Sequence, residues 1–242
     1  MIIAAIRSVA TYIAVSVYVL FAASLGMLIE MIFRWKGILY ILGHGGVRLG
    51  LALSGITVRI AGAEHIPLDR AAVYCANHQS NVDPPILFTK LHPRMHIVYK
   101  AEINAIPLLA RAFQHGGFVP IERRNKEAAM RSLEAGAASI KAGNSFLIFP
   151  EGTRSKTAEM LPFKKGGFLM ALKAQAPIVP VAISGGRDAM RRGSKIIRPV
   201  NVSIRVGAPI ETAGMQMSDR DTLIARVRER INALLAEGPV VD

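Results

Sequence analysis

The first thirty residues constrain the fold of this chain more than any other part of its sequence. Residues 8–29 read SVATYIAVSVYVLFAASLGMLI and contain no charged side chain. About 20 consecutive apolar residues are enough for a helix to cross the hydrocarbon core of a bilayer. An ordinary soluble core does not require such a segment, so we expect it to associate with a membrane.

A cleaved signal peptide is the alternative interpretation of the same segment. Such a peptide has a shorter apolar region, followed by a cleavage site of small residues. Ala22-Ala23-Ser24 resembles such a site only loosely, and the apolar run continues past it to Phe33. More Lys and Arg residues follow the segment than precede it, which predicts that the rest of the chain faces the cytoplasm.

A second apolar stretch, residues 38–56, contains His44, Arg48 and several glycines. It is too polar for a second membrane span by these criteria. Two interpretations stay open, an amphipathic helix at the membrane surface and a core helix of the following domain. We therefore predict a membrane-anchoring helical segment over residues 1–56 and a second domain over residues 57–242.

From Thr57 onward, short β-branched runs alternate with helical stretches. The predicted strands cover residues 57–60, 72–76, 96–99, 118–121, 146–149, 178–183 and 201–206. The predicted helices cover residues 84–90, 106–114, 126–141, 166–175 and 221–236. This alternation predicts an α/β domain with a mixed, largely buried sheet flanked by helices.

The balance of charge limits the partners of the chain. It carries 30 Lys and Arg against 17 Asp and Glu, a net charge of +13. A strongly basic protein attracts nucleic acid, anionic lipid headgroups or phosphorylated ligands. A nucleic-acid-binding protein should show basic patches interleaved with aromatic residues or a known recognition motif. We find neither, and that function leaves residues 8–29 unexplained, so we expect no nucleic-acid partner.

The single cysteine, Cys75, excludes an internal disulfide framework and a multi-cysteine zinc site. It lies in the apolar run 71–76, which favours burial in the core over a nucleophilic Cys–His pair. The histidines show no metal-ligand spacing beside an acidic residue, so we expect no metal.

The first candidate for chemistry is the segment NHQSNVDPP, residues 77–85, which follows a predicted strand. His78 begins a polar loop, and Asp83 is a plausible helix N-cap with Pro84 at the first helical position. Such a turn brings the carboxylate beneath the imidazole, where it fixes the tautomer and leaves the other ring nitrogen as a base. This is the base and its orienting acid from a catalytic triad, with a substrate hydroxyl in place of the serine. The alternative is a capping Asp beside an ordinary loop His.

The segment FPEGTRS, residues 149–155, also follows a predicted strand. Gly152 permits a close backbone approach, and the Thr153 hydroxyl, Arg154 and backbone N–H groups form a plausible anion cradle. The alternative is a surface turn with a solvated charge pair.

A third segment, GGFVPIERR, covers residues 116–124. Arg123 ends a predicted strand, and its planar guanidinium suits two phosphate oxygens at once. The alternative is a solvated Arg beside Glu122.

Taken in order, these segments resemble the motif blocks of the phospholipid/glycerol acyltransferase (PlsC-like) family, and 1-acylglycerol-3-phosphate acyltransferases are the member type they resemble most. The similarity covers residues 57–210. The quoted blocks are Asn77-His78-x4-Asp83, Gly117-Phe118-x-Pro120-Ile121-Glu122-Arg123, Phe149–Ser155 and Val179-Pro180-Val181-Ala182-Ile183.

The resemblance implies acyl transfer from acyl-CoA or acyl carrier protein to the sn-2 hydroxyl of 1-acylglycerol-3-phosphate, without an acyl-enzyme intermediate and without a cofactor. It implies that His78 is the base and Asp83 its orienting acid. It also implies a phosphate site made of Arg123, Glu151, Gly152, Thr153 and Arg154. It implies that Pro180 shapes the side where the acyl donor binds. Supporting roles fall to Asn77, Lys100, Lys164 and Lys165. The family's second block more often ends in Asp-Arg, so Glu122 leaves the exact acceptor open.

The implied partners are membrane phospholipids, lysophosphatidic acid and the acyl donor, at the cytoplasmic membrane with the catalytic domain in the cytoplasm. Two alternatives are an acyltransferase for another acceptor, such as a lyso-aminolipid or glycerol-3-phosphate, and a membrane-anchored lipid-binding module without catalysis. A basic cluster is either a solvated loop or a face for anionic lipid or an acidic carrier protein. It comprises Arg187, Arg191, Arg192, Lys195 and Arg198.

Overall fold

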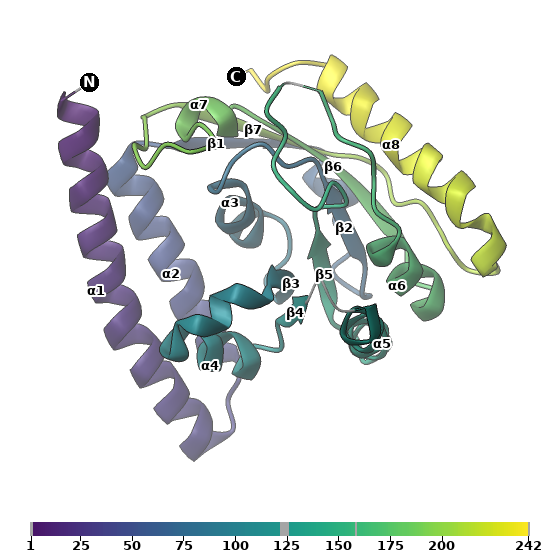
Figure 1. Ribbon diagram of the computed structural model, residues 1–242, viewed down its shortest axis with the longest axis horizontal. Helices are drawn as coiled ribbons and strands as arrows, with labels where there is room; N and C mark the ends of the chain where they lie inside the picture. The colour runs from purple at the N-terminus through teal and green to yellow at the C-terminus, as the bar shows by residue number, and fades with distance from the viewer. Residues whose placement is uncertain (1, 122–125, 158, 242) are drawn as a thin grey trace.

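The computed structural model describes residues 2–121, 126–157 and 159–241. It begins with two apolar helices, α1 (Ile2–Phe33) and α2 (Gly37–Ser54), which lie side by side at one edge of the molecule (Figure 1). By length and composition both could cross a membrane, which differs from the expectation that residues 38–56 are too polar for a second span. Tyr18 of α1 donates a hydrogen bond from its hydroxyl to the Leu42 carbonyl of α2 at 2.9 Å, so the helices are joined by a polar contact as well as by apolar packing.

The rest of the described chain forms a seven-stranded sheet in the order β1-β7-β6-β2-β5-β3-β4. Neighbouring strands run parallel except β6 and β7, which are antiparallel. The strands are β1 (Thr57–Ala61), β2 (Val73–Ala76), β3 (Met95–Lys100), β4 (Val119–Ile121), β5 (Ser145–Ile148), β6 (Ile178–Ser184) and β7 (Asn201–Val206). The predicted mixed α/β fold is confirmed.

The five helices predicted after residue 57 are present, with ends that differ by one residue at most. The helices are α3 (Asp83–Lys90), α4 (Pro107–His115), α5 (Lys126–Lys141), α6 (Gly166–Ala174), α7 (Gly186–Ala189) and α8 (Arg220–Ala236). Short 3-10 turns cover Ala63–His65, Ala101–Ala105 and Met217–Asp219. The sequence pattern did not predict α7 or the 3-10 turns, because so few residues show no helical period.

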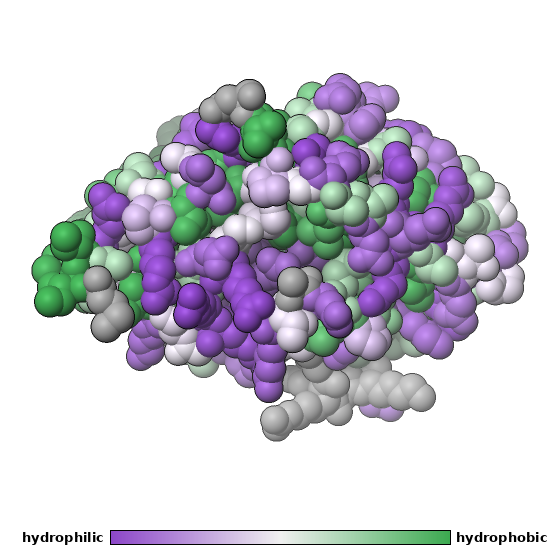
Figure 2. Space-filling view, turned by 90° about the horizontal axis from the view of Figure 1, so that it is seen from above, coloured by the Kyte–Doolittle hydropathy of each residue, from purple (hydrophilic) through white to green (hydrophobic). Residues whose placement is uncertain are grey.

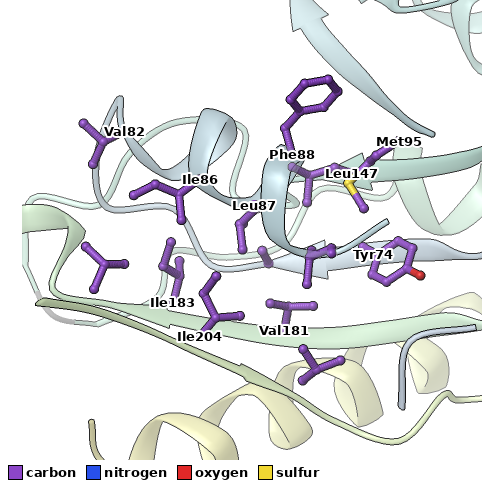
Figure 3. Close-up of a cluster of buried hydrophobic side chains, with 14 of the residues drawn as sticks. Tyr74, Val82, Ile86, Leu87, Phe88, Met95, Leu147, Val181, Ile183 and Ile204 are labelled. Atoms are coloured by element: carbon purple, nitrogen blue, oxygen red, sulfur yellow. The ribbon is translucent and has the colours of Figure 1, made fainter. Parts of the chain in front are cut away.

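Apolar side chains fill both faces of the sheet. On one face the strands pack against α3, with Ile86 and Leu87 of that helix directed at Val181 and Ile183 (Figure 3). On the other face α5, α6 and α8 cover the sheet, as Figure 1 shows. Burying one such aliphatic side chain contributes about 1.5–3 kcal/mol, so the central strands are held firmly from both sides.

Helix α2 packs on the core beside α3. Residues 38–56 were expected to form either an amphipathic helix at the membrane surface or a core helix, and the helix has features of both. Tyr40 belongs to the buried core, stacks on Phe88, and donates a hydrogen bond from its hydroxyl to the Gly116 carbonyl at 2.7 Å. Other residues of α2, such as Ile41, are exposed. The helix therefore has one face on the α/β part and an apolar face directed away from it.

Helix α1 also contacts the α/β part near both of its ends. Near its start, the Ile197 N–H donates to Ser8 Oγ at 2.8 Å, and the Tyr12 hydroxyl donates to the Lys195 carbonyl at 2.8 Å. Near its end, the Glu30 carboxylate lies 2.8 Å from His115 Nδ1 of α4. The whole helix consequently lies along the molecule.

Candidate active site

His78 and Asp83 form a hydrogen-bonded pair at the carboxyl end of β2. His78 follows the strand by two residues, and Asp83 is the first residue of α3. The distance from His78 Nδ1 to Asp83 Oδ2 is 3.1 Å. The carboxylate is fully buried, while the imidazole is 15% exposed. The structure therefore brings the two side chains together, with the ring accessible and its acid partner shielded from water.

Asp83 does not cap its own helix, which corrects one expectation. Val82 occupies the N-cap position, and Asp83 Oδ2 turns back to accept the N–H groups of Gln79 and Ser80, each at 2.7 Å. The physical reason is that Pro84 and Pro85 carry no N–H, so the first turn offers a cap few donors to bind. The carboxylate instead fixes the loop that carries His78.

The geometry decides which imidazole nitrogen is basic. A carboxylate at Nδ1 keeps the proton on that nitrogen, so the lone pair stays on Nε2. His78 lines a large cavity, and in this tautomer the ring can accept a proton there.

The 149–155 segment holds His78 from several sides. The Phe149 ring stacks on the imidazole, with 4.2 Å between ring centroids. Glu151 Oε1 accepts the His78 N–H at 2.7 Å, and the Ser155 N–H donates to the His78 carbonyl at 2.9 Å. Two segments that are 70 residues apart in the sequence therefore form one rigid unit around the imidazole.

The position of Glu151 differs from its expected place in a phosphate site. Its side chain is buried, and Oε2 accepts the Leu161 N–H at 2.8 Å while Oε1 is bound to His78. Burial raises the pKa of the carboxyl, and the Leu161 and His78 N–H groups oppose that rise. Both oxygens face backbone donors, so the carboxylate joins the loops around His78, and it is not among the residues that line the cavity.

The cavity beside His78 has a volume of about 1370 Å³. It exceeds the few hundred to about 1,000 Å³ of common small-molecule sites. Most of its wall is apolar, with contributions from α1, α2, α3 and α4 and from the strands and loops beside His78. The polar and cationic part of the wall comes from Gly152, Thr153, Arg154, Lys164 and Lys100, and Lys100 is paired with Glu102 at 2.8 Å. An amphipathic anion with a long apolar chain suits such a wall.

The other predicted site residues lie in different places. Lys165 is exposed at the start of α6. Asn77 is buried and joins β2 to β6, because its amide donates to the Ile183 carbonyl at 2.9 Å and accepts the Ile183 N–H at 2.8 Å. Arg123 and Glu122 lie outside the described residues.

Pro180 does not lie beside the cavity, contrary to expectation. It is buried in β6, and a Cβ added at Gly207 would meet both the Pro180 ring at 3.0 Å and Leu234 of α8 at 3.2 Å. Side chains alternate between the two faces of a strand, and this register turns Pro180 toward α8. Its neighbours Val179 and Val181 belong to the core on the α3 face.

Cys75 is fully buried in β2, as expected. Burial raises the pKa of its thiol well above the ordinary value, and the Glu151 carboxylate adds to the rise. The thiol is therefore a small core group and not a thiolate nucleophile. In the described part of the chain, no group of three or more His, Cys, Asp and Glu side chains is placed to hold a metal ion.

Sequence reasoning missed two residues of this region. Gly186, after β6, lies against Asp83, where an added Cβ would be 2.1 Å from Oδ1. Ser80 is buried and donates from Oγ to the Met190 carbonyl at 2.8 Å. The Gly185-Gly186 pair at a strand end was the available signal for the first, because glycines there often mark a close approach.

The basic cluster lies between α1 and the 149–155 segment. Arg192 donates to the Arg154 carbonyl at 2.9 Å, and Lys195 lines the cavity while its carbonyl accepts the Tyr12 hydroxyl. These contacts make the cluster part of the cavity's surroundings.

Comparison with known proteins agrees with this arrangement. The family model described as Acyltransferase matches residues 57–184. A 1-acyl-sn-glycerol-3-phosphate acyltransferase of Limnanthes alba is 30% identical over 223 residues, which cover 90% of this chain and 79% of the relative. One of Cocos nucifera is 35% identical over 178 residues, which cover 73% of this chain and 56% of the relative.

A solved structure has the same fold. The crystal structure of the 1-acyl-sn-glycerophosphate (LPA) acyltransferase PlsC from Thermotoga maritima matches with a TM-score of 0.85 and 23% identity, over 98% of this chain and 97% of that one. The sheet, the His–Asp loop and the family match define an acyltransferase, and this chain belongs to the acyltransferase family. It is an O-acyltransferase, which confirms the predicted class of enzyme.

Proposed function

We propose that this enzyme transfers a fatty acyl group from an acyl thioester to the sn-2 hydroxyl of 1-acylglycerol-3-phosphate, and so makes phosphatidic acid. The observation that carries the proposal is the His78–Asp83 pair, whose imidazole lines a cavity with both cationic and apolar side chains in its wall. The names of the relatives support the same acceptor. The acyl donor is acyl-CoA or acyl carrier protein, and we expect no further cofactor.

The reaction needs a base and a means of stabilising the charge that the base acquires. His78 Nε2 takes the proton of the acceptor hydroxyl as its oxygen attacks the thioester carbonyl. The tetrahedral intermediate collapses and breaks the C–S bond, and the leaving thiolate takes the proton from the imidazolium. Asp83 stabilises that imidazolium and keeps the ring in one orientation.

The acceptor phosphate is placed at the cationic part of the wall. Arg154, Thr153, Gly152 and Lys164 line this part, while Lys100, which lines the same cavity, is paired with Glu102. Arg123 enters the proposal through the family resemblance. Glu151 enters in a different role, since its two backbone hydrogen bonds support a function in positioning His78.

The apolar helices support binding at one face of the cytoplasmic membrane. Helix α1 contacts the α/β part near both ends, and lying along the membrane surface keeps these contacts, whereas crossing the bilayer breaks them at one end. Hydrophobic surface gathers at the left edge of Figure 2, the side where Figure 1 places α1. The neighbouring Arg192 and Lys195 suit anionic headgroups.

The test is an assay of purified protein with labelled acyl-CoA and acyl carrier protein against a panel of lyso-acceptors. We expect transfer to lysophosphatidic acid above the other acceptors, and a loss of about 10²–10⁴-fold in His78→Ala, the range for removing a general base. Membrane association should survive this substitution. Full activity in His78→Ala contradicts the mechanism, and preference for a lyso-aminolipid contradicts the acceptor.

A further inference from the structure

Arg228 lies on α8, beyond the residues that the family model matches, yet it is connected to the active site. Its guanidinium donates to two successive carbonyls, from Nη1 to Leu161 at 2.7 Å and from Nη2 to Met160 at 2.8 Å. The same group lies over the Phe163 ring, 5.2 Å from the centroid. Arg228 therefore fixes the backbone of the 160–163 segment with a geometry that a single ammonium cannot reproduce.

The peptide group held by Arg228 is the one that holds Glu151. The Met160 carbonyl and the Leu161 N–H belong to one amide plane, and that N–H donates to Glu151 Oε2 at 2.8 Å. The other oxygen of Glu151 accepts the His78 N–H at 2.7 Å. A continuous hydrogen-bond chain thus runs from the guanidinium through one peptide and one buried carboxylate to the backbone of His78.

We propose that Arg228 is a positioning residue for His78, and that it acts through the Met160–Leu161 peptide and the Glu151 carboxylate. The proposal rests on the proposed function, in which His78 is the base. Hydrogen bonds in such a chain polarise one another, so the cation at one end strengthens the hold on His78 at the other. Loss of that hold misplaces the imidazole without removing any group that touches substrate.

The experiment compares Arg228→Met and Arg228→Lys with Arg226→Met and Arg230→Met, which alter exposed arginines of the same helix. We expect Arg228→Met to lower kcat by about 10- to 100-fold, the range for a small misplacement of a reacting group, with KM changed little. Arg228→Lys should lower kcat less than Arg228→Met does, because lysine keeps the positive charge but cannot bind both carbonyls at once as the planar guanidinium does. The two control variants should behave like the wild-type enzyme.

The pH profile separates positioning from simple support of the fold. The charged and titratable groups that act on Glu151 are His78, Arg228 and the buried thiol of Cys75. Removing the cation raises the pKa of the Glu151 carboxyl further, and a protonated carboxyl accepts the two N–H groups less well. The acid limb of kcat/KM should therefore move to higher pH in Arg228→Met.

A double-mutant cycle tests the route. If Arg228 acts through Glu151, Arg228→Met should lower kcat much less in a Glu151→Gln enzyme than in the wild-type enzyme. Additive losses, a wild-type kcat in Arg228→Met, or an unmoved acid limb in a folded variant each overturn the proposal. If the wild-type enzyme transfers acyl groups and His78→Ala does not, these outcomes count against the role of Arg228 alone. Absence of transfer by the wild-type enzyme counts against the proposed function itself.

Discussion

Among single residues, Asp83 shows most clearly how close packing defines the site. Its Oδ2 accepts three hydrogen bonds, while Oδ1 is buried and has no hydrogen-bond partner among the described residues. The backbone of Gly186 lies against Oδ1, so close that a Cβ there would be 2.1 Å from this oxygen. The missing side chain at position 186 is what lets the carboxylate sit beneath the imidazole.

We predict that Gly186→Ala lowers kcat at least about tenfold, because the new methyl group displaces the Asp83 carboxylate from Nδ1. The backbone at Gly186 is not in the left-handed region, so contact and not strain causes the effect. Steady-state kinetics of purified protein provides the measurement.

The control for Gly186→Ala is Gly136→Ala in α5. An added Cβ there meets the flexible end of Met170, which can move aside, so we expect little change in kcat. A Gly186→Ala enzyme with normal kcat and reduced thermal stability alone contradicts the prediction.

Site residues that lie close together in the sequence could be predicted, whereas those that lie far apart could not. His78 and Asp83 lie five positions apart, and a polar loop followed by a proline-started helix predicts their meeting. Gly186 and Arg228 are more than 100 positions from them. The glycine pair at the end of β6 indicates a close approach there. The local sequence does not show which group approaches Gly186 or which carbonyls Arg228 binds, because these contacts depend on how the strands are ordered.

At the scale of elements, the end of β2 is joined to β6 by a side chain. The Asn77 amide occupies both the N–H and the carbonyl of Ile183, as a further residue of a strand would. This link lies beside His78 and sets where the His78 loop leaves the sheet. The resemblance implied a supporting role for Asn77, and the structure places it in the scaffold and away from the cavity.

We predict that Asn77→Ala lowers the free energy of unfolding by about 2–3 kcal/mol, since it leaves two buried backbone groups unpaired. Thermal unfolding in detergent, read as a lower Tm, measures the effect. Asn232→Ala, on the exposed side of α8, is the matched control and should leave Tm unchanged. Equal Tm values for the two variants refute the scaffold role.

The elements themselves follow from local patterns. The strands coincide with short β-branched runs and the helices with longer amphipathic stretches, so their positions were predicted to within a residue or two. The face of the sheet to which a side chain points was harder to predict from the sequence. Pro180 was expected beside the acyl donor and lies on the α8 face, because the face of a residue in a buried strand depends on register, and both faces of this strand are apolar.

For the whole molecule, the exposed apolar face of α1 is the feature that supports the proposed binding to a membrane. Large apolar side chains such as Ile13, Phe21 and Leu25 are exposed along the helix, while the polar side chains Ser8, Thr11 and Glu30 face the protein. This is the reverse of a soluble surface helix. The arrangement suits a helix whose outer face lies in lipid and whose inner face closes the cavity.

We predict that a Phe21→Glu, Leu25→Glu double variant binds vesicles of zwitterionic and anionic phospholipid several-fold more weakly, because each carboxylate must be moved out of water. Vesicle flotation measures the bound fraction. Ala225→Glu, on the exposed side of α8, should bind like the wild-type protein. Unchanged flotation of the double variant argues against lipid contact by this face.

High salt should weaken the share of binding to anionic vesicles that comes from the basic cluster.

The sequence by itself determined an apolar segment long enough to cross a membrane, the alternation that makes an α/β domain, and the spacing that lets His78 and Asp83 meet. These features depend on neighbours a few positions apart, where chain geometry alone decides which side chains meet. Only the tertiary structure decided that Glu151 holds the His78 backbone, that Gly186 makes room for Asp83, and that Arg228 reaches the site from the last helix. Those contacts join segments separated by more than 60 residues, and they exist because the strand order places β2 between β5 and β6.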